Sequence, residues 1–291
     1  MIFDLLLPLA ILFALVSAYN YCDNKTHACN ELGFKHFICQ LDDELPSHEG
    51  TKFEGTVPDT QHFQKEVLGL LNDFRNHLAS GEVMNNANRT FPSARRMRRL
   101  IWDNELAYLA RVHASTVSFK HTMCRSTLRF PDIGEVMAIM AAPVVKKLTV
   151  SKVLRNAFRS MWKQHWKVES PDNLINQFDA ASAFLAADFA NIINDRVSRV
   201  GCSVAVGSNC PYAGSLGHCH FLTCYFDHNN IINSSLYEAG PPASGCGDSK
   251  TTVRGVWDNL CENNGDIFPK FHPAGLKVKD KRTFILHTIS Q

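Results

Sequence analysis

Cysteine is the residue type with the most evident chemistry in this chain. The ten cysteines are Cys22, Cys29, Cys39, Cys124, Cys202, Cys210, Cys219, Cys224, Cys246 and Cys261. Their number is even, no Cys-x-x-Cys occurs, and they follow an apolar leader typical of secretion. That combination favours structural disulfides over metal or redox chemistry. We therefore expect all ten cysteines to be paired.

The side chains of known catalytic motifs are not found at their usual spacings. His-Glu-x-x-His, Gly-x-Ser-x-Gly and the phosphate-binding loop do not occur. A formal net charge of +2 argues against a nucleic-acid partner, which usually requires a basic face. The dense basic run, residues 94–99, is expected to be a solvated loop. Asn-x-Ser/Thr sequons predict glycosylation at Asn24, Asn88 and Asn233.

Residues 1–18 predict a cleaved signal peptide. The apolar run from Leu5 to Val16 is shorter than the about 20 residues that span a bilayer, and Ser17 and Ala18 are small, as signal peptidase requires. Because the leader carries Asp4 and no basic residue, a retained short anchor stays open as an alternative. We expect a secreted, extracellular protein with no stable membrane span.

Helical and strand periodicities together predict an α+β fold. Apolar residues recur at helical spacing in four segments, 63–78, 100–114, 150–167 and 180–193. Gly81 would end the first helix, Asp103 would cap the second, and Pro171 would break the chain after the third. Alternation with period two predicts strands at 200–206 and 220–226, joined by a turn-rich loop, with a further candidate at 135–141. Helices around a few antiparallel strands make a layered α+β domain.

Composition divides the mature chain into three parts. Residues 19–60 carry cysteines among polar, Gly- and Pro-broken sequence, so an irregular disulfide-held arm is expected. Residues 61–237 hold the predicted helices and strands and form the main domain. Residues 238–291 begin with Glu-Ala-Gly-Pro-Pro and form a small hinge-like extension with a tail.

Six motifs, in order, resemble the pattern of the CAP superfamily. They are Leu71-Asn72-Asp73-Phe74-Arg75, Trp102 to His121 with Cys124, Gly134-Glu135-Val136, Trp162-Lys163-Gln164-His165, Ala187-Asp188-Phe189-Ala190-Asn191 running on to Val200-Gly201-Cys202, and Cys224-Tyr225-Phe226. The arm and residues 236–241 are similar to antigen-5-related, venom allergen-like proteins of insects. The resemblance implies a three-layer α-β-α sandwich, an extracellular setting and no established single reaction. Members have been linked to lipid or sterol binding and to divalent metals, and the fold alone does not choose among these.

The resemblance also implies a central cleft. In the family two His and two Glu converge there; here His121 and Glu135 match the first of each, whereas His165 stands at the second Glu position and Asp188 at the second His position. We expect all four side chains in one cavity that binds zinc weakly, if at all. Plain degeneration of the site and a working, rearranged polar site both stay open.

Two functions follow as alternatives. The first is a monomeric, non-catalytic protein that binds an extracellular ligand, which could be a lipid or sterol, a small molecule or a receptor. The second is a metal-dependent hydrolase or protease, with His121 and His165 as ligands and Glu135 as general base.

The disulfide pairing rests partly on the resemblance and partly on parity. The family pattern suggests Cys202 with Cys224 and Cys22 with Cys29. Because two family cysteines are missing, one of them at Val117, parity leaves Cys39 to pair with Cys124. Two further bridges, Cys210 with Cys219 and Cys246 with Cys261, complete the set of five.

Overall fold

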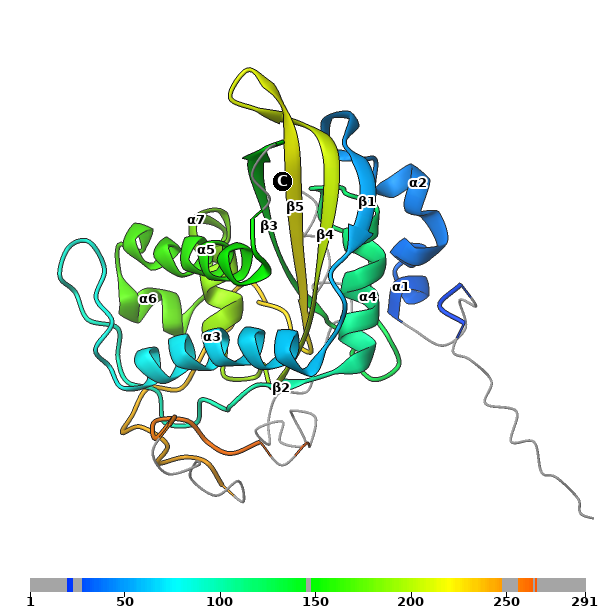
Figure 1. Cartoon of the computed structure of the whole chain (residues 1–291). Helices are drawn as coiled ribbons and strands as arrows, with labels where there is room; N and C mark the ends of the chain where they lie inside the picture. The colour runs from blue at the N-terminus through cyan, green and yellow to red at the C-terminus, as the bar shows by residue number, and fades with distance from the viewer. Residues whose placement is uncertain (1–19, 23–27, 145–147, 248–255, 264, 266–291) are drawn as a thin grey trace, which may run out of the picture.

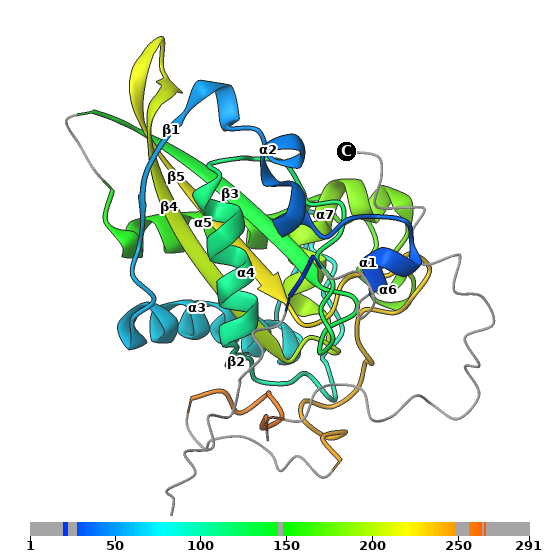
Figure 2. The same ribbon diagram turned by 90° about the vertical axis from the view of Figure 1, so that its right-hand side faces the viewer.

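Two layers of helices enclose one sheet. The computed structural model describes residues 20–22, 28–144, 148–247, 256–263 and 265. α4 (Asn104–Ser115) covers one face of the sheet, and the other helices of the domain lie on the opposite side (Figure 1; turned view in Figure 2). These are α3 (Gln61–Ala79), α5 (Val150–Trp162), α6 (Pro171–Asn176) and α7 (Ala180–Ile193). The predicted α-β-α sandwich is therefore confirmed.

The sheet has the strand order β1-β4-β5-β3, and all three pairings along it are antiparallel. These strands are β1 (Lys52–Thr56), β3 (Gly134–Pro143), β4 (Arg199–Tyr212) and β5 (Ser215–Phe226), and the short β2 (Ile101–Trp102) runs parallel to β4. The predicted loop 207–214 is mostly strand. Only Ala213 and Gly214 form the turn, both with positive φ as a type I′ hairpin requires.

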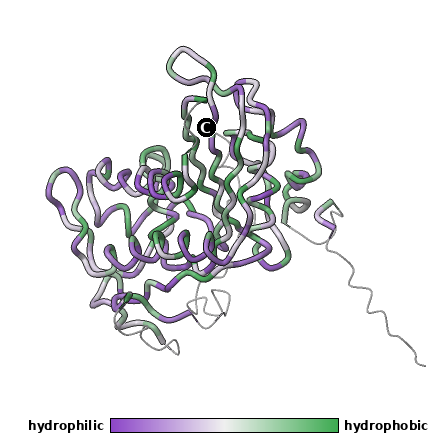
Figure 3. The backbone as a smooth tube through the Cα atoms, viewed as in Figure 1, coloured by the Kyte–Doolittle hydropathy of each residue, from purple (hydrophilic) through white to green (hydrophobic). Residues whose placement is uncertain are grey.

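Alternation along the central strands builds two cores. Val204 and Leu222 join the large cluster under α3, α5 and α7, whereas Ala205 and Phe221 pack on the side of α4. Figure 3 shows hydrophobic residues concentrated along these strands. Among the described residues, no helix is both long and apolar enough to cross a bilayer. The predicted signal peptide and Asn24 lie outside the described residues.

All four predicted helices are present, but two of the predicted segments differ in part: in 100–114 the helix α4 begins only at Asn104, because Ile101 and Trp102 form β2, and 150–167 changes its winding. Asp103 caps α4, because its Oδ1 accepts from the backbone N–H groups of Glu105 and Leu106. The segment 150–167 is not one helix: α5 ends at Trp162, and residues Lys163–Lys167 continue as the 3₁₀ helix η3. Pro171 begins α6 behind the Ser170 cap rather than simply breaking the chain.

Arg75, on α3, fixes three segments of the domain at once. Its guanidinium is buried and donates to the backbone oxygens of Arg98, Ile192, Asn194 and Val197 at 2.6–3.0 Å. Burial lowers the pKa of Arg75 to about 9. The side chain therefore serves the architecture and is not available to a ligand.

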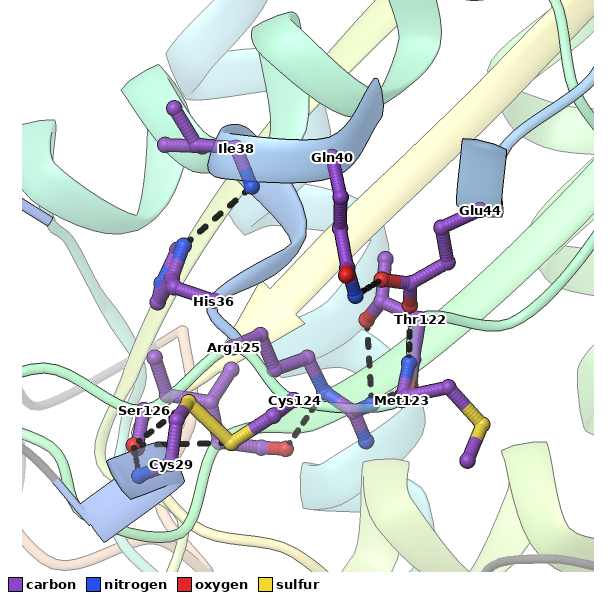
Figure 4. Close-up of a disulfide and its surroundings, with 11 residues drawn as sticks. Cys29, His36, Ile38, Gln40, Glu44, Thr122, Met123, Cys124, Arg125 and Ser126 are labelled. Carbon is purple, nitrogen blue, oxygen red and sulfur yellow. Dashed lines mark hydrogen bonds between the residues drawn. A yellow bond between two sulfur atoms is a disulfide. The ribbon is translucent and has the colours of Figure 1, made fainter. Parts of the chain in front are cut away.

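The arm is more ordered than expected. It contains α1 (Ala28–Glu31), η1 (Phe37–Gln40), α2 (Leu41–Glu44), η2 (His48–Gly50) and the edge strand β1. Phe37 and Leu45 are buried against residues of α4. Glu44 accepts from the backbone N–H of Met123, and Gln40 donates to the same carboxylate (Figure 4). The arm thus packs on the domain as well as being tied to it.

Two of the predicted disulfide pairings are wrong. The structure pairs Cys22 with Cys39 and Cys29 with Cys124, each with Cα atoms 5.6 Å apart. The α1 turn brings Cys29 beside Ser126, whose hydroxyl accepts from the Cys29 N–H (Figure 4). Cys22 therefore does not pair with Cys29, the cysteine that follows it in the sequence, because the fold of the arm brings Cys39 back to Cys22. The other three bridges, Cys202–Cys224, Cys210–Cys219 and Cys246–Cys261, are confirmed.

Peptide mapping without reduction tests this arm. We expect protease fragments joined as Cys22–Cys39 and Cys29–Cys124, because the Cα atoms of each of these pairs lie 5.6 Å apart, within bonding distance. The Cys202–Cys224 fragment, predicted by both the resemblance and the structure, is the internal control. Recovery of Cys22 joined to Cys29 would contradict the arrangement of the arm.

The basic run is not a solvated loop. Arg95 pairs with Glu238, Arg96 with Asp195 and Arg99 with Glu262, at 2.9, 2.6 and 3.0 Å. The backbone of residues 93–99 also exchanges hydrogen bonds with residues 238–261. Every third side chain from Phe91 to Leu100 is buried. The run therefore fastens the described part of the C-terminal extension to the domain.

Candidate functional site

Glu135 lies at the centre of the site predicted from the sequence. It is the second residue of β3, opposite Tyr225 in β5, and its side chain is fully buried. The Tyr225 hydroxyl and the Thr122 hydroxyl donate to Oε1 at 3.0 and 3.1 Å. Oε2 accepts from the Thr122 N–H at 3.2 Å and lies 2.6 Å from His121 Nδ1.

Two further groups face the same carboxylate. His113 Nδ1 lies 3.0 Å from Glu135 Oε1, and Arg125 Nη1 lies 3.6 Å from Oε2. Burial alone would raise the pKa of Glu135, but the Arg125 charge and the hydrogen bonds from His113 and His121 hold it well below its usual range. A carboxylate has about four lone-pair sites. Those of Glu135 are therefore taken up by donors of this chain.

His121 connects the buried carboxylate to the surface. Its side chain is 51% exposed, while Nδ1 contacts Glu135. Burial works against the charged ring, but the hydrogen bond and charge of Glu135 outweigh it and raise the pKa of His121. The imidazole is thus protonated over a wider pH range than usual, and a protonated imidazole is not a metal ligand.

Asp188, on α7, lies within electrostatic range of His121 and Glu135. Burial raises its pKa, opposed by the His121 charge and by the 2.7 Å hydrogen bond that Gln164 Nε2 donates to Oδ2. Gln164 Oε1 also accepts from the N–H of Phe189, so this amide holds η3 and α7 together. Gln164 therefore stands next to Asp188, where His165 was expected.

His165 has its contacts in an aromatic cluster rather than with the Glu135 carboxylate. Its Nδ1 lies 2.7 Å from the Trp162 backbone oxygen, and its ring packs among Phe91, Trp162 and Phe189 with centroids 5.5–6.4 Å apart. Burial in this aromatic cluster lowers the pKa of His165. Of the four predicted residues, the structure thus brings His121 and Glu135 into contact and leaves Asp188 within electrostatic range of both, whereas the partners of His165 are Trp162, Phe91 and Phe189.

The donor set does not fit a zinc ion. Within the described part of the chain, no group of three or more His, Cys, Asp or Glu side chains is arranged to hold a metal. Glu135 is saturated, the raised pKa of His121 favours its protonated ring, and the Arg125 guanidinium adds a positive charge. A divalent cation would have to displace these partners to bind here.

Sequence reasoning missed most of the polar partners of Glu135. From the sequence, no polar role was assigned to His113, Arg125 or Thr122, and Tyr225 entered only as part of a family motif. The available signal was His113 on the apolar stripe of its helix, because a buried polar side chain needs a partner. That signal does not identify the partner, which here comes from β3.

Two cavities among the described residues lie away from this network. One, of about 180 Å³, is lined by residues of α4 and β4, and another, of about 190 Å³, by residues of α3 and α5. They share Val57 and Phe63 at the start of α3. Neither includes a residue of the Glu135 network.

Known proteins match this chain in sequence and in fold. Residues 68–226 match the CAP model, the cysteine-rich secretory protein family. Venom allergen-1 of Aedes aegypti is 26% identical over 228 residues, which cover 78% of this chain and 82% of that protein. Tabinhibitin 10 of Tabanus yao is 28% identical over 254 residues, covering 87% and 94%.

Two solved structures share the fold. BmVAL-1 superimposes with a TM-score of 0.57 at 23% identity, covering 70% of this chain and 95% of that one. NaASP2, solved with Zn²⁺, gives 0.52 at 18% identity, covering 64% and 92%. The family model matches more than half of the sequence, and these structures share the fold. The chain therefore belongs to the CAP, or cysteine-rich secretory protein, family.

Proposed function

We propose that this chain is a secreted, non-catalytic protein that binds an extracellular ligand beside His121. The observation that carries this proposal is the saturation of Glu135. A general base must have a lone pair directed at a water molecule, and this carboxylate is buried among donors of its own chain. Its lowered pKa makes it a weaker base still. The site is therefore better suited to binding than to hydrolysis.

The disulfides support an extracellular setting. All ten cysteines are paired, and such bridges persist in oxidising compartments but are rare in the cytosol. Asn88 and Asn233, the sequons within the described residues, are both exposed, as glycosylation requires.

Apolar side chains at the start of α7 support a lipid, or another ligand with an apolar part. Phe184 is 74% exposed and Leu185 is also exposed; they precede Asp188 in α7 by four and three residues, with a break in the helix at Ala186 between them. Two neighbouring exposed apolar side chains offer a small apolar surface of the kind that can contact a ligand or partner. His121 and Asp188 would supply the polar contacts that orient such a ligand.

Binding of a fluorescent fatty acid and a fluorescent sterol tests the lipid form of this proposal. We expect saturable binding to the wild type and at least a tenfold loss in Phe184→Ser/Leu185→Ser, because about 3 kcal/mol of apolar contact would be removed. The matched control is Phe53→Ser/Leu216→Ser, which changes exposed residues of the same types on the sheet. Equal binding by both variants, or none by the wild type above a folded control protein, would exclude a lipid at this site.

Titration with zinc tests the alternative function, that of a metal-dependent hydrolase. We expect equal heats from the wild type and His121→Ala at neutral pH in calorimetry, because the residues do not form a zinc site. A saturable one-to-one heat that disappears in His121→Ala would instead favour the metal-dependent alternative. His121 is the residue to change, since it is half exposed, whereas replacing Glu135 would disturb the buried network.

A further inference from the structure

Cationic side chains follow the outer surface of α5 and η3. They are Lys152, Arg155, Arg159, Lys163 and Lys167, and all five are exposed. The first four follow one another at steps of three, four and four residues, so they lie along one face of the helix. At 1.5 Å per residue this basic stripe, Lys152 to Lys163, is about 16 Å long.

The basic stripe is not neutralised by the rest of the chain. Residues 150–167 contain no Asp or Glu, and within the described residues no carboxylate forms an ion pair with any of the five cations. Two acidic residues come near its ends: Glu66 accepts from the Ser151 hydroxyl at one end, and Glu169 follows Lys167 in the sequence at the other. In the basic run near residue 95, by contrast, three arginines have acidic partners. The stripe is therefore an unpaired positive surface.

We propose that the basic stripe binds a linear sulfated polysaccharide. The charges form a line, which complements a linear polyanion. The exposed positions between them, Asn156 and Ser160, are polar and can hydrogen-bond to sugar hydroxyl or sulfate groups. Trp166 is 44% exposed at the end of the line, with the Lys163 ammonium 5.1 Å from its ring, and an aromatic face suits a sugar ring.

Membranes and nucleic acids fit this surface less well. Helices that bind in a membrane interface insert an apolar face. The apolar face of α5, including Val153, Phe158 and Met161, is instead buried in the core. Nucleic acid is not the expected polyanion outside the cell, where the disulfides place this chain. The inference goes beyond the proposed function, because the stripe shares no residue with the His121–Glu135 contact.

Binding to immobilised heparin oligosaccharide, at about physiological salt, tests the inference. The stripe variant is Lys152→Gln/Arg155→Gln/Arg159→Gln/Lys163→Gln. The control, Lys35→Gln/Lys52→Gln/Arg89→Gln/Arg111→Gln, removes the same number of exposed lysines and arginines elsewhere. We expect about tenfold weaker binding for the stripe variant, since four weak ion pairs are lost together, and less than twofold for the control. Wild-type binding should weaken as salt rises, and His121→Ala should bind like the wild type.

Competition and direct binding of other polyanions identify which ligand the basic stripe prefers. Desulfated heparin should not compete, and phosphatidylserine vesicles and duplex DNA should bind more weakly than heparin. No heparin binding, equal losses in the two quadruple variants, or tighter binding of vesicles or DNA through the same four residues would each overturn the proposal. Loss of heparin binding in His121→Ala would also overturn it, because the cleft rather than the stripe would then be the site.

Discussion

Replacing Gly201 by alanine is expected to destabilise the fold by about 4 kcal/mol or more, which is at the extreme of single substitutions. A Cβ atom at Gly201 would lie 2.0 Å from the backbone nitrogen of Ala107 and 2.5 Å from the carbonyl carbon of Leu106. Both atoms belong to the backbone of α4, so no side-chain rotation can relieve the overlap. Either α4 must lift from β4 or the strand must bend, and the packing between them is lost.

Thermal or urea unfolding with the disulfides intact measures this effect. A loss of 4 kcal/mol corresponds to a fall of about 10 °C in Tm for a domain of this size. Gly69→Ala is the matched control, because Gly69 lies within α3 with nothing within 4 Å of its Cβ position. There alanine should stabilise the helix by about 0.5–1 kcal/mol. A Gly201→Ala protein with an unchanged midpoint would contradict the close contact of α4 with the sheet.

Replacing Glu135 by glutamine is expected to cost about 3–5 kcal/mol, the usual penalty for breaking one side of a buried charge network. The amide keeps the size of the side chain but removes the charge that faces Arg125. Its NH₂ group is a donor and would face the donors that now bond to the carboxylate, so it would find no acceptor there. Glu238→Gln is the control, because that carboxylate is exposed and pairs with Arg95 at the surface. Its loss should cost at most about 1 kcal/mol.

The pH dependence of unfolding separates the charge from the shape of Glu135. Because its pKa is lowered in the fold, Glu135 stabilises the protein fully above its unfolded value of about 4.3, and this contribution is lost as the pH falls through the lower folded pKa. The stabilities of wild type and Glu135→Gln should therefore converge in acid. Curves that stay parallel from pH 7 to pH 2 would show that the charge contributes nothing.

His121 should have the opposite dependence on pH. Its pKa is raised in the fold, so its contribution is present below about 6.5 and is lost as the pH rises through the higher folded pKa. His121→Gln should therefore be less stable than the wild type in mildly acidic solution and equal to it at higher pH.

Local sequence patterns predicted the helices and strands of this fold, because the spacing of apolar residues in a segment depends on the backbone conformation of that same segment. The segment 180–193 has the bounds of α7, and the alternation in 200–206 and 220–226 places both strands of the hairpin. The strands run further than the pattern indicated, because their outer ends carry Gly, Pro and Asn. Those residues resemble a loop, although the ladder of β4 and β5 resumes at Cys210 after an irregularity between Gly207 and Cys210.

The site was harder to predict because it depends on winding and on contacts between distant segments. An α-helix turns about 100° per residue and a 3₁₀ helix about 120°. The change from α5 to η3 at Trp162 therefore redirects the side chains that follow, and Gln164 meets Asp188 while His165 enters the aromatic cluster. The partners of Cys22 and Cys29 likewise depend on how the arm returns to the domain, which cysteine spacing does not record.

The attachment of the C-terminal extension also has a consequence for proteolysis. Arg95-Arg96 and Arg98-Arg99 are dibasic sequences of the kind that trypsin-like and processing proteases cut. Such enzymes need an accessible, extended backbone in their clefts, yet the N–H groups of Arg95 and Arg99 are bonded to the carbonyls of Glu238 and Cys261. The Cys246–Cys261 bridge also joins two segments that bond to this run, because the Gly245 N–H donates to the Arg95 carbonyl and the Cys261 N–H donates to the Met97 carbonyl. Two cleavage sequences are thus hidden for as long as the extension stays in place.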